Sequence, residues 1–294
     1  MAATRYGTSC NLIVVQDLRH NGCMPILNKD MTLCISLAAR PSNIGTRFHN
    51  YLYDALGLNF VYKAFAPVDL AQAVAGIRGL GIRGAAVSMP YKEDVIALID
   101  VMDASATAID SVNTIVNTDG VLTAYNTDYL AIARLLATNA IDPATTVLLR
   151  GSGGMAKAVA AAMHDAGFAH VTIVARNEER GRALAALYGF SWLAEVSDAS
   201  DAGMLINVTP LGMSGADELV QSFSDSLVNA AQVVFDVVAL PAETPLIKAA
   251  RAAGKHVITG AEVIAIQAEE QFVLYTGVRP SPELVREASE FSRS

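Results

Sequence analysis

Cysteine is scarce in this sequence, and the three present, Cys10, Cys23 and Cys34, all stand near its beginning. Their odd number does not fit a disulfide framework, and their spacing is not that of metal ligands. The sequence therefore predicts a protein of a reducing compartment without a metal site. We expect it to be cytoplasmic.

A net positive charge and long apolar runs are also lacking. Nucleic-acid binding needs clustered Lys and Arg, so the formal net charge of −8 argues against a nucleic-acid partner. Near the start, the apolar run Leu12–Val15 is shorter than the hydrophobic region of a signal peptide. No stretch of about 18 apolar residues exists to span a bilayer, so we expect no membrane partner.

Aliphatic residues dominate what is present. Hydrophobic residues make up 52% of the chain but aromatic residues only 6%, a balance that suits parallel strands covered by Ala-rich helices. The length of 294 residues allows one large domain or two ordinary ones.

Short apolar runs alternate with helical patterns from residue 31 onward. Strands are expected at Leu33–Leu37, Phe60–Phe65 and Gly84–Met89, and helical patterns at Phe48–Leu56, Leu70–Ile77 and Pro90–Ile99. Pro90 would stand in the first turn of its helix, where proline is tolerated. This series of strands and helices predicts a mainly parallel sheet.

A hairpin separates the two halves of the pattern. Val112–Val116 and Val121–Tyr125 flank an Asp-Gly pair at Asp119 and Gly120, which marks a tight turn. A second series of strands then begins, at Thr145–Arg150, Val171–Ala175, Met204–Asn207, Val233–Val238 and Lys255–Ile258. We therefore expect two αβ units that meet near Thr127, and we find no motif in residues 1–30.

The second series opens with a glycine-rich turn. The strand ending at Arg150 runs into Gly151, Ser152, Gly153, Gly154 and Met155, and a helix is expected over Ala156–Ala166. Glycines here permit a tight turn and let the backbone approach a pyrophosphate at the helix N-terminus. The order of strand, turn and helix favours a dinucleotide site over a plain tight turn.

The end of the next strand indicates which dinucleotide is bound. NAD-binding folds usually place a carboxylate there, but this chain has Ala175, Arg176 and Asn177, with Arg180 one turn later. Guanidinium groups suit a 2′-phosphate, so the sequence predicts NADP as the cofactor. The alternative is that both arginines are ordinary solvated residues at a helix start.

Three polar positions in the first half stand out. Lys92 falls in a predicted first helical turn, where acids are preferred, and Asn113 falls within a predicted apolar strand. Thr127 or Asp128 would serve simply to cap the next helix. Taken singly, each position is explained best by a structural role.

Taken together, the motifs resemble those of the shikimate dehydrogenase family, in the family's order. They are Val87-Ser88-Met89-Pro90-Tyr91-Lys92, Val112-Asn113-Thr114, Asn126-Thr127-Asp128, Gly151-Ser152-Gly153-Gly154, Asn207-Val208-Thr209-Pro210-Leu211-Gly212-Met213, Asp236-Val237-Val238, Thr244-Pro245-Leu246, Gly260 and Gln267. The resemblance implies a substrate domain over residues 1–127 and a Rossmann-type NADP domain over 128–260, with a cleft between them. Residues 261–294 would pack back onto the substrate domain.

The resemblance also implies roles for single residues. Lys92 would be the general acid or base and Asp128 its partner, since oxidising an alcohol removes a hydroxyl proton as hydride leaves the carbon. The implied contacts to the substrate come from Ser88, Asn113 and Gln267. The implied contacts to the cofactor come from Thr209, Val237 and Gly260, and the last two would lie near the nicotinamide.

One part of the family pattern is missing. The family binds the substrate carboxylate with two serines in Ser-Lys-Ser-Pro-x-x-His-Asn, and these positions are Asn43 and Gly45 when the motif is anchored on His49. A family tyrosine is replaced by Ala239. We expect Asn43, Thr46 and Arg47 to supply donors instead, with Arg40 and Ser42 close in sequence, while His49 is read as a structural helix residue. In this respect the chain resembles a divergent shikimate dehydrogenase-like branch.

These features predict an NADP-dependent oxidoreductase that acts on a small carboxylated ring, as a monomer or homodimer. The main hypothesis is the reversible oxidation of shikimate to 3-dehydroshikimate, weak because the serines are absent. A dehydrogenase for another cyclic polyol acid, such as quinate or an aminated shikimate, is the alternative enzyme. A cofactor-binding sensor is the alternative of another class, but it would need neither Lys92 nor Asp128.

Overall fold

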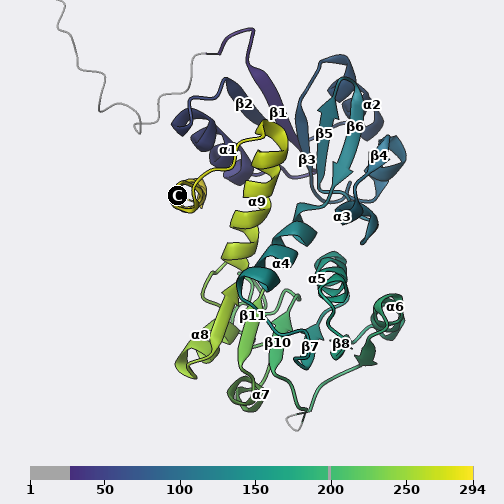
Figure 1. Ribbon diagram of the computed structural model, residues 1–294, viewed down its shortest axis with the longest axis vertical. Helices are drawn as coiled ribbons and strands as arrows, with labels where there is room; N and C mark the ends of the chain where they lie inside the picture. The colour runs from purple at the N-terminus through teal and green to yellow at the C-terminus, as the bar shows by residue number, and fades with distance from the viewer. Residues whose placement is uncertain (1–26, 198–199, 294) are drawn as a thin grey trace, which may run out of the picture.

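The computed structural model describes residues 27–197 and 200–293, which form two αβ units joined by two helices that run from one unit to the other (Figure 1). Cys10, Cys23 and the Leu12–Val15 run lie outside the described residues. Within the described ranges, every helix falls short of the length or the apolar character that crossing a bilayer requires.

The first unit is built on a six-stranded sheet of order β2-β1-β3-β5-β6-β4. Its strands are β1 (Thr32–Leu37), β2 (Phe60–Phe65), β3 (Gly84–Val87), β4 (Val101–Met102), β5 (Thr114–Thr118) and β6 (Val121–Tyr125). Its helices are α1 (Asn43–Ala55), α2 (Leu70–Gly79), the 3₁₀ helix η1 (Asp94–Leu98) and α3 (Ala104–Thr107). Parallel pairing joins β2, β1 and β3, and also β4 and β6, while β5 pairs antiparallel with both of its neighbours.

Strand β1 shows how alternation distributes its side chains to the two faces of this sheet. Ile35 packs in one core cluster with Val74 and Ile77 of α2. Cys34 points the other way and packs in a second cluster with residues of α1 and of the C-terminal helices. Both faces are covered, as the continuous apolar run in the sequence requires.

The predicted hairpin is present as β5 and β6. Asp119 and Gly120 have φ of 53° and 86°. Positive φ at both central residues is the geometry that an Asp-Gly turn supplies, and its twist suits the flanking strands. The turn is therefore limited to two residues, and β5 extends to Thr118.

The α-helix predicted from Pro90 is absent. The chain forms turns there, and η1 begins only at Asp94. The carbonyl of Lys92 accepts from the backbone N–H of Val112, and the N–H of Ile96 donates to Glu93 three residues back. Contact with the segment before β5 therefore occupies the Lys92 carbonyl, which in an α-helix would accept from Ile96.

The second unit is a fully parallel sheet of order β12-β11-β10-β7-β8-β9. Its strands are β7 (Val147–Arg150), β8 (Val171–Val174), β9 (Ser191–Leu193), β10 (Met204–Asn207), β11 (Val233–Asp236) and β12 (His256–Thr259). Its helices are α5 (Gly154–Asp165), α6 (Glu178–Tyr188), α7 (Asp225–Ala230) and α8 (Pro245–Ala252). The strand order reverses between β7 and β10, and sheets of this kind bind their ligands at the carboxyl ends of the strands where the order reverses.

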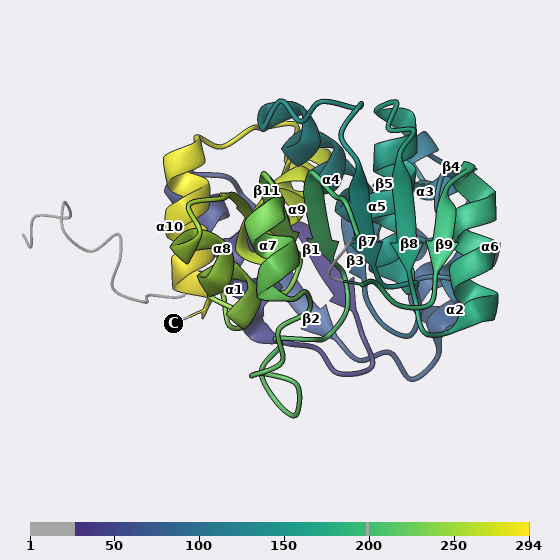
Figure 2. The ribbon, with the colours of Figure 1, turned by 90° about the horizontal axis from the view of Figure 1, so that it is seen from below.

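The two faces of this sheet also carry separate cores. Leu149 and Ile206 pack toward α4 (Thr127–Thr138) and α5, whereas Leu148 and Leu205 pack toward α7 and α8. Figure 2 shows these helices on opposite faces of the strands. The predicted α/β class, with two mainly parallel sheets, is confirmed.

Two long helices join the units. Helix α4 leads from the first sheet to the second, and α9 (Gly260–Thr276) returns alongside it (Figure 1). Arg134 of α4 donates to Glu269 of α9 at 2.8 Å, and the Glu269 side chain is only 5% exposed. Helix α10 (Pro282–Arg293) then packs against α1, where Tyr51 Oη donates to Glu287 at 3.2 Å.

Candidate active site

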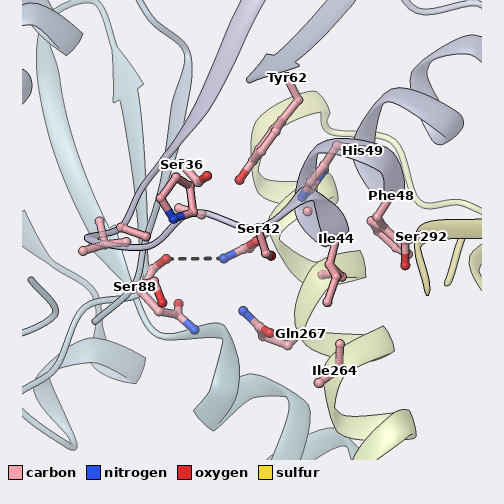
Figure 3. Close-up of a pocket in the computed structure, with 18 of the residues that line it drawn as sticks. Ser36, Ser42, Ile44, Phe48, His49, Tyr62, Ser88, Ile264, Gln267 and Ser292 are labelled. Carbon is pink, nitrogen blue, oxygen red and sulfur yellow. Dashed lines mark hydrogen bonds between the residues drawn. The ribbon is translucent and has the colours of Figure 1, made fainter. Parts of the chain in front are cut away.

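A cavity of about 380 Å³ lies beside the first sheet, between its strand ends and helix α9. Ser36 and Ser88 reach it from β1 and from the end of β3, and Gln267 faces them from α9 (Figure 3). Ser42, Ile44, Phe48 and His49 approach it from the start of α1, and Ser292 from α10. All of its lining residues lie between Ser36 and Asp128 or between Ile264 and Ser292.

Lys92 and Asp128 meet in this cavity. Lys92 Nζ donates to Asp128 Oδ2 at 2.7 Å, and their side chains are 30% and 13% exposed. A short bond between a partly buried ammonium and carboxylate is charge-assisted and orients both groups. The pair therefore holds an exchangeable proton at the cavity wall.

Asp128 is not needed to cap α4. Asn126 is the N-cap residue, and its Oδ1 accepts from the N–H of Tyr129 at 3.0 Å. The interpretation of Thr127 or Asp128 as the cap is wrong, because Asn126 is held in place by donating its amide to Ser111 O at 3.0 Å. The Asp128 carboxylate is left to Lys92 and the cavity.

Asn113 presents an available donor. It lies just before β5, is 1% exposed, and its Oδ1 accepts from the N–H of Thr127 at 2.8 Å and from Thr114 Oγ1 at 2.9 Å. Its Nδ2 is buried without a hydrogen-bond partner among the described residues. Because a buried donor without a partner is unfavourable, this amide is suited to a ligand oxygen.

Gln271 was missed from the sequence. Its Nε2 donates to Thr114 Oγ1 at 3.0 Å and to Asn113 O at 3.3 Å, and the residue lines the cavity. The available signal was its spacing: it stands four residues after Gln267, and such residues share a helix face.

His49 and Tyr62 make an uncharged, aromatic part of the wall. Their rings stack with centroids 4.5 Å apart, and both residues line the cavity. Burial lowers the pKa of His49 to about 3 and raises the pKa of the Tyr62 hydroxyl. Both side chains are therefore neutral near pH 7, and His49 adds its buried ring to the cavity wall as well as to the core around α1.

Three predicted contacts are not brought to the cavity. Asn43, Thr46 and Arg47 are absent from its lining. Asn43 is exposed, the Thr46 hydroxyl is buried without a partner in the described part of the chain, and the Arg47 guanidinium lies over the Phe291 ring. The reason is helical geometry. Residues 44, 45, 48 and 49 lie on the face of α1 that lines the cavity, whereas residues 43, 46 and 50 lie on the opposite face. Asn50 on that other face bonds Thr46 O and Tyr62 O instead.

The glycine-rich turn lies at the carboxyl end of β7. Gly151 has φ of 131°, and a Cβ there would stand 2.7 Å from Val208 Cγ2. Gly153 is the N-cap of α5, without a side-chain cap, so the first N–H groups of α5 are left for a ligand next to Ser152, Gly154 and Met155. These features fit the pyrophosphate of a dinucleotide.

The arginines after β8 are exposed. Arg176 and Arg180 make no ion pair with any residue in the described ranges. Asn177 is the N-cap of α6, and its Oδ1 accepts from the N–H of Arg180 at 2.9 Å. Its side-chain oxygen therefore supports the helix, and the two guanidinium groups are the ones suited to a 2′-phosphate.

The remaining predicted cofactor positions follow the ends of β10, β11 and β12. Thr209 Oγ1 donates to Asn207 Oδ1 at 2.6 Å, which shapes the turn after β10. A Cβ on Gly260 would stand 2.3 Å from the Val237 carbonyl oxygen, so the start of α9 presses on the backbone after β11. Because all strands are parallel, these segments share one edge of the sheet with Gly151.

The fold and the site together define a class. The reversed parallel sheet with its glycine-rich turn is that of dinucleotide-binding domains, and the Lys92–Asp128 cavity belongs to the neighbouring unit. In the described part of the chain, no three His, Cys, Asp or Glu side chains gather at metal-binding distances.

Comparison with known proteins identifies the family. Residues 43–115 match the sequence model of the shikimate dehydrogenase substrate binding domain. A shikimate dehydrogenase-like protein of Haemophilus influenzae is 52% identical over 92% of this chain and 99% of its own. A shikimate dehydrogenase (NADP(+)) of Moorella thermoacetica is 37% identical over 87% of this chain and 92% of its own.

A solved structure supports the same family assignment. The shikimate 5-dehydrogenase of Thermus thermophilus in complex with NADP(H) and shikimate superimposes with a TM-score of 0.79 at 28% identity, covering 89% of this chain and all of that one. This chain belongs to the shikimate dehydrogenase family, whose members are oxidoreductases that act on CH–OH groups with NADP.

Proposed function

We propose that this protein is an NADP-dependent dehydrogenase that interconverts shikimate and 3-dehydroshikimate, with shikimate a poor substrate because the paired serines are missing. The observation that supports it most directly is the Lys92–Asp128 pair, 2.7 Å apart, in a cavity of about 380 Å³. We assign residues 1–127 and 261–294 to the substrate unit and 128–260 to the NADP unit. The lining of the cavity supports this division, with Asp128 at the border.

The residues around the cofactor position fit NADP. Gly151 permits the positive-φ turn after β7, the uncapped start of α5 offers N–H donors to the pyrophosphate, and Arg176 and Arg180 offer guanidinium groups to the 2′-phosphate. NADP, when bound, would supply the nicotinamide that accepts or donates the hydride.

Proton transfer is the task of Lys92. In the reductive direction, the ammonium of Lys92 donates a proton to the ketone oxygen as hydride reaches the carbon. In the oxidative direction the same nitrogen takes the hydroxyl proton back. Asp128 holds Nζ in place throughout, since it accepts one of the ammonium hydrogens at 2.7 Å.

Neutral polar groups orient the ring. Ser88 and Gln267 face each other across the cavity (Figure 3), and the free Nδ2 of Asn113 is a donor to a ring hydroxyl. Holding the reacting carbon in one position contributes to rate, because a misplacement of about 1 Å can lower it about a hundredfold.

The absence of the two serines favours a second candidate substrate within the same chemistry. With Asn43 turned away and Gly45 bearing no side chain, the carboxylate site differs from the family pattern. A different cyclic polyol acid, of the quinate or aminoshikimate type, would then be the better substrate.

A substrate panel tests the proposal. The purified protein is incubated with NADP⁺ and shikimate, quinate or aminoshikimate, and reduction is followed by nicotinamide absorbance. We expect turnover of at least one ring acid by the native protein, and turnover lower by about a hundred- to ten-thousandfold for a Lys92→Ala variant. Tight NADP⁺ binding without turnover of any member would overturn the enzyme assignment in favour of a sensor.

A further inference from the structure

We propose that Arg40 binds the carboxylate of the substrate, in place of the paired serines, at the mouth of the cavity. This inference rests on the proposed function, because it concerns how the same ring acid is held. It assigns the anion contact to a residue outside the serine positions of the motif.

Charge inventory leads to Arg40. The charged residues that line the cavity are Arg40, Lys92 and Asp128. Lys92 is already paired with Asp128, whereas Arg40 makes no hydrogen bond or ion pair with any residue that the structure describes. Arg40 is thus the lining cation whose charge is left for a ligand.

The rest of the wall supplies uncharged groups. His49 and Tyr62 are buried and neutral, and Ser36 beside them is uncharged. Burial of a carboxylate is less costly where a charged group binds it, and with the paired serines missing Arg40 is the cation of the lining without a partner in the described ranges. The anionic end of the substrate is therefore expected at the exposed rim, where Arg40 lies, with uncharged hydroxyls deeper in the cavity.

The backbone places Arg40 and Lys92 at the same edge. Arg40 follows β1 and Lys92 follows β3, and these strands are parallel neighbours with Leu37 opposite Val87. Backbone bonds continue past the strands: the N–H of Ser88 donates to Leu37 O at 2.9 Å, and that of Ala39 to Met89 O at 3.2 Å. A ring acid held by Lys92 at its reacting hydroxyl can therefore direct another substituent toward Arg40.

The start of α1 adds donors beside the guanidinium. Ser42 is the N-cap of this 13-residue helix but forms no side-chain cap bond, and Ser42, Ile44 and Gly45 all line the cavity. The first N–H groups of a helix carry partial positive charge and lack partners inside the helix. A carboxylate bonded to the planar fork of Arg40 would lie next to them.

The decisive variant is Arg40→Met, which keeps an unbranched apolar side chain but removes the charge. The matched control is Arg251→Met, an exposed arginine on α8 that pairs with Glu243 far from the cavity. Each protein is tested with NADP⁺ and either shikimate or shikimate methyl ester. Affinity is measured by equilibrium dialysis, and KM and kcat are measured for whichever ring acid of the panel turns over.

We expect Arg40→Met to weaken shikimate binding about ten- to a hundredfold. Affinity for the methyl ester should change little, and kcat should stay close to that of the native protein, because the contact serves ground state and transition state alike. Arg40→Lys should recover part of the loss, and Arg251→Met should match the native protein.

Three results would overturn the inference. The first is an Arg40→Met variant that still prefers shikimate over its ester as the native protein does, and the second is a native protein that binds both equally. The third is a native enzyme that turns over a ring acid with a KM unaffected by Arg40→Met, which would exclude the role of Arg40 but leave the proposed dehydrogenase standing. If the native protein turned over no ring acid but preferred shikimate to its ester only when Arg40 is present, the role of Arg40 would stand and the proposed dehydrogenase would fail.

Discussion

Lys92 Nζ lies 2.7 Å from Asp128 Oδ2, although 36 positions separate the two residues in the chain. Other contacts hold the backbone of each residue. The carbonyl of Lys92 accepts from Val112, and the helix that carries Asp128 is capped by the Asn126 side chain. Removing one side chain should therefore leave the backbone position of the other unchanged, which makes substitutions at this pair informative about chemistry.

Lys92→Ala is expected to lower turnover about a hundred- to ten-thousandfold, the usual contribution of a general acid or base. NADP affinity should be nearly unchanged, because Lys92 lies in the first unit and the nucleotide-binding edge in the second. Steady-state rates and NADP titration measure both quantities, with exposed Lys248→Ala of α8 as the control. A variant with normal kcat and a raised KM would show that Lys92 binds the substrate without transferring its proton.

Arg176→Ala is expected to weaken NADP binding by about 1.5–3 kcal/mol, or ten- to a hundredfold, while NAD binding stays the same. The reason is that only NADP carries the 2′-phosphate that a guanidinium group would bind. Arg182→Ala is the matched control, since Arg182 pairs with Glu178 and stacks 4.3 Å from the Trp192 ring centroid. Equal weakening of NAD and NADP, measured by calorimetric titration, would remove the phosphate role.

Gly260→Ala is expected to destabilise the fold by about 1–3 kcal/mol, because its Cβ would stand 2.3 Å from the Val237 carbonyl oxygen and backbone must move. Gly76→Ala, in the interior of α2 with open space around it, should instead stabilise by about 0.5–1 kcal/mol. Urea denaturation gives both free energies of unfolding. If the two variants shifted stability equally, the close approach at Gly260 would not matter to the fold.

His49 should make the protein sensitive to acid. Its pKa is lowered to about 3 in the folded state by burial, from 6.5 when exposed, so between these values only the unfolded chain binds the proton. The contribution of His49 to the free energy of unfolding has its full value above pH 6.5. It decreases as the pH falls toward 3, and at pH 5 it is smaller by about 2 kcal/mol.

A comparison of variants isolates this contribution from other titrating groups. The free energy of unfolding of His49→Gln should fall less between pH 7 and pH 5 than that of the native protein, by about 2 kcal/mol. His170→Gln, at an exposed position just before β8, should retain the native dependence. Identical pH dependence in all three proteins would mean that His49 is not held neutral by the fold.

Local pattern sufficed for most of the secondary structure. The strands Phe60–Phe65 and Met204–Asn207 begin and end where the apolar runs predicted, and the hairpin turns at Asp119 and Gly120. Side-chain alternation and turn residues act over a few positions, so a single stretch of sequence contains them. The short strands β4 and β9 were not predicted, because two or three residues carry too little periodicity.

The sequence by itself determined which residues could do the chemistry: the ordered motifs singled out Lys92, Asp128, Asn113 and the glycine-rich turn before any fold was known. Only the tertiary structure decided which neighbours surround them. It brought Arg40, His49 and Gln271 to the cavity and turned Asn43 and Thr46 away. The physical reason is that a helix presents a different face every 100°, and the face of α1 that meets the cavity is set by packing against β2, α9 and α10, contacts between segments far apart in the chain.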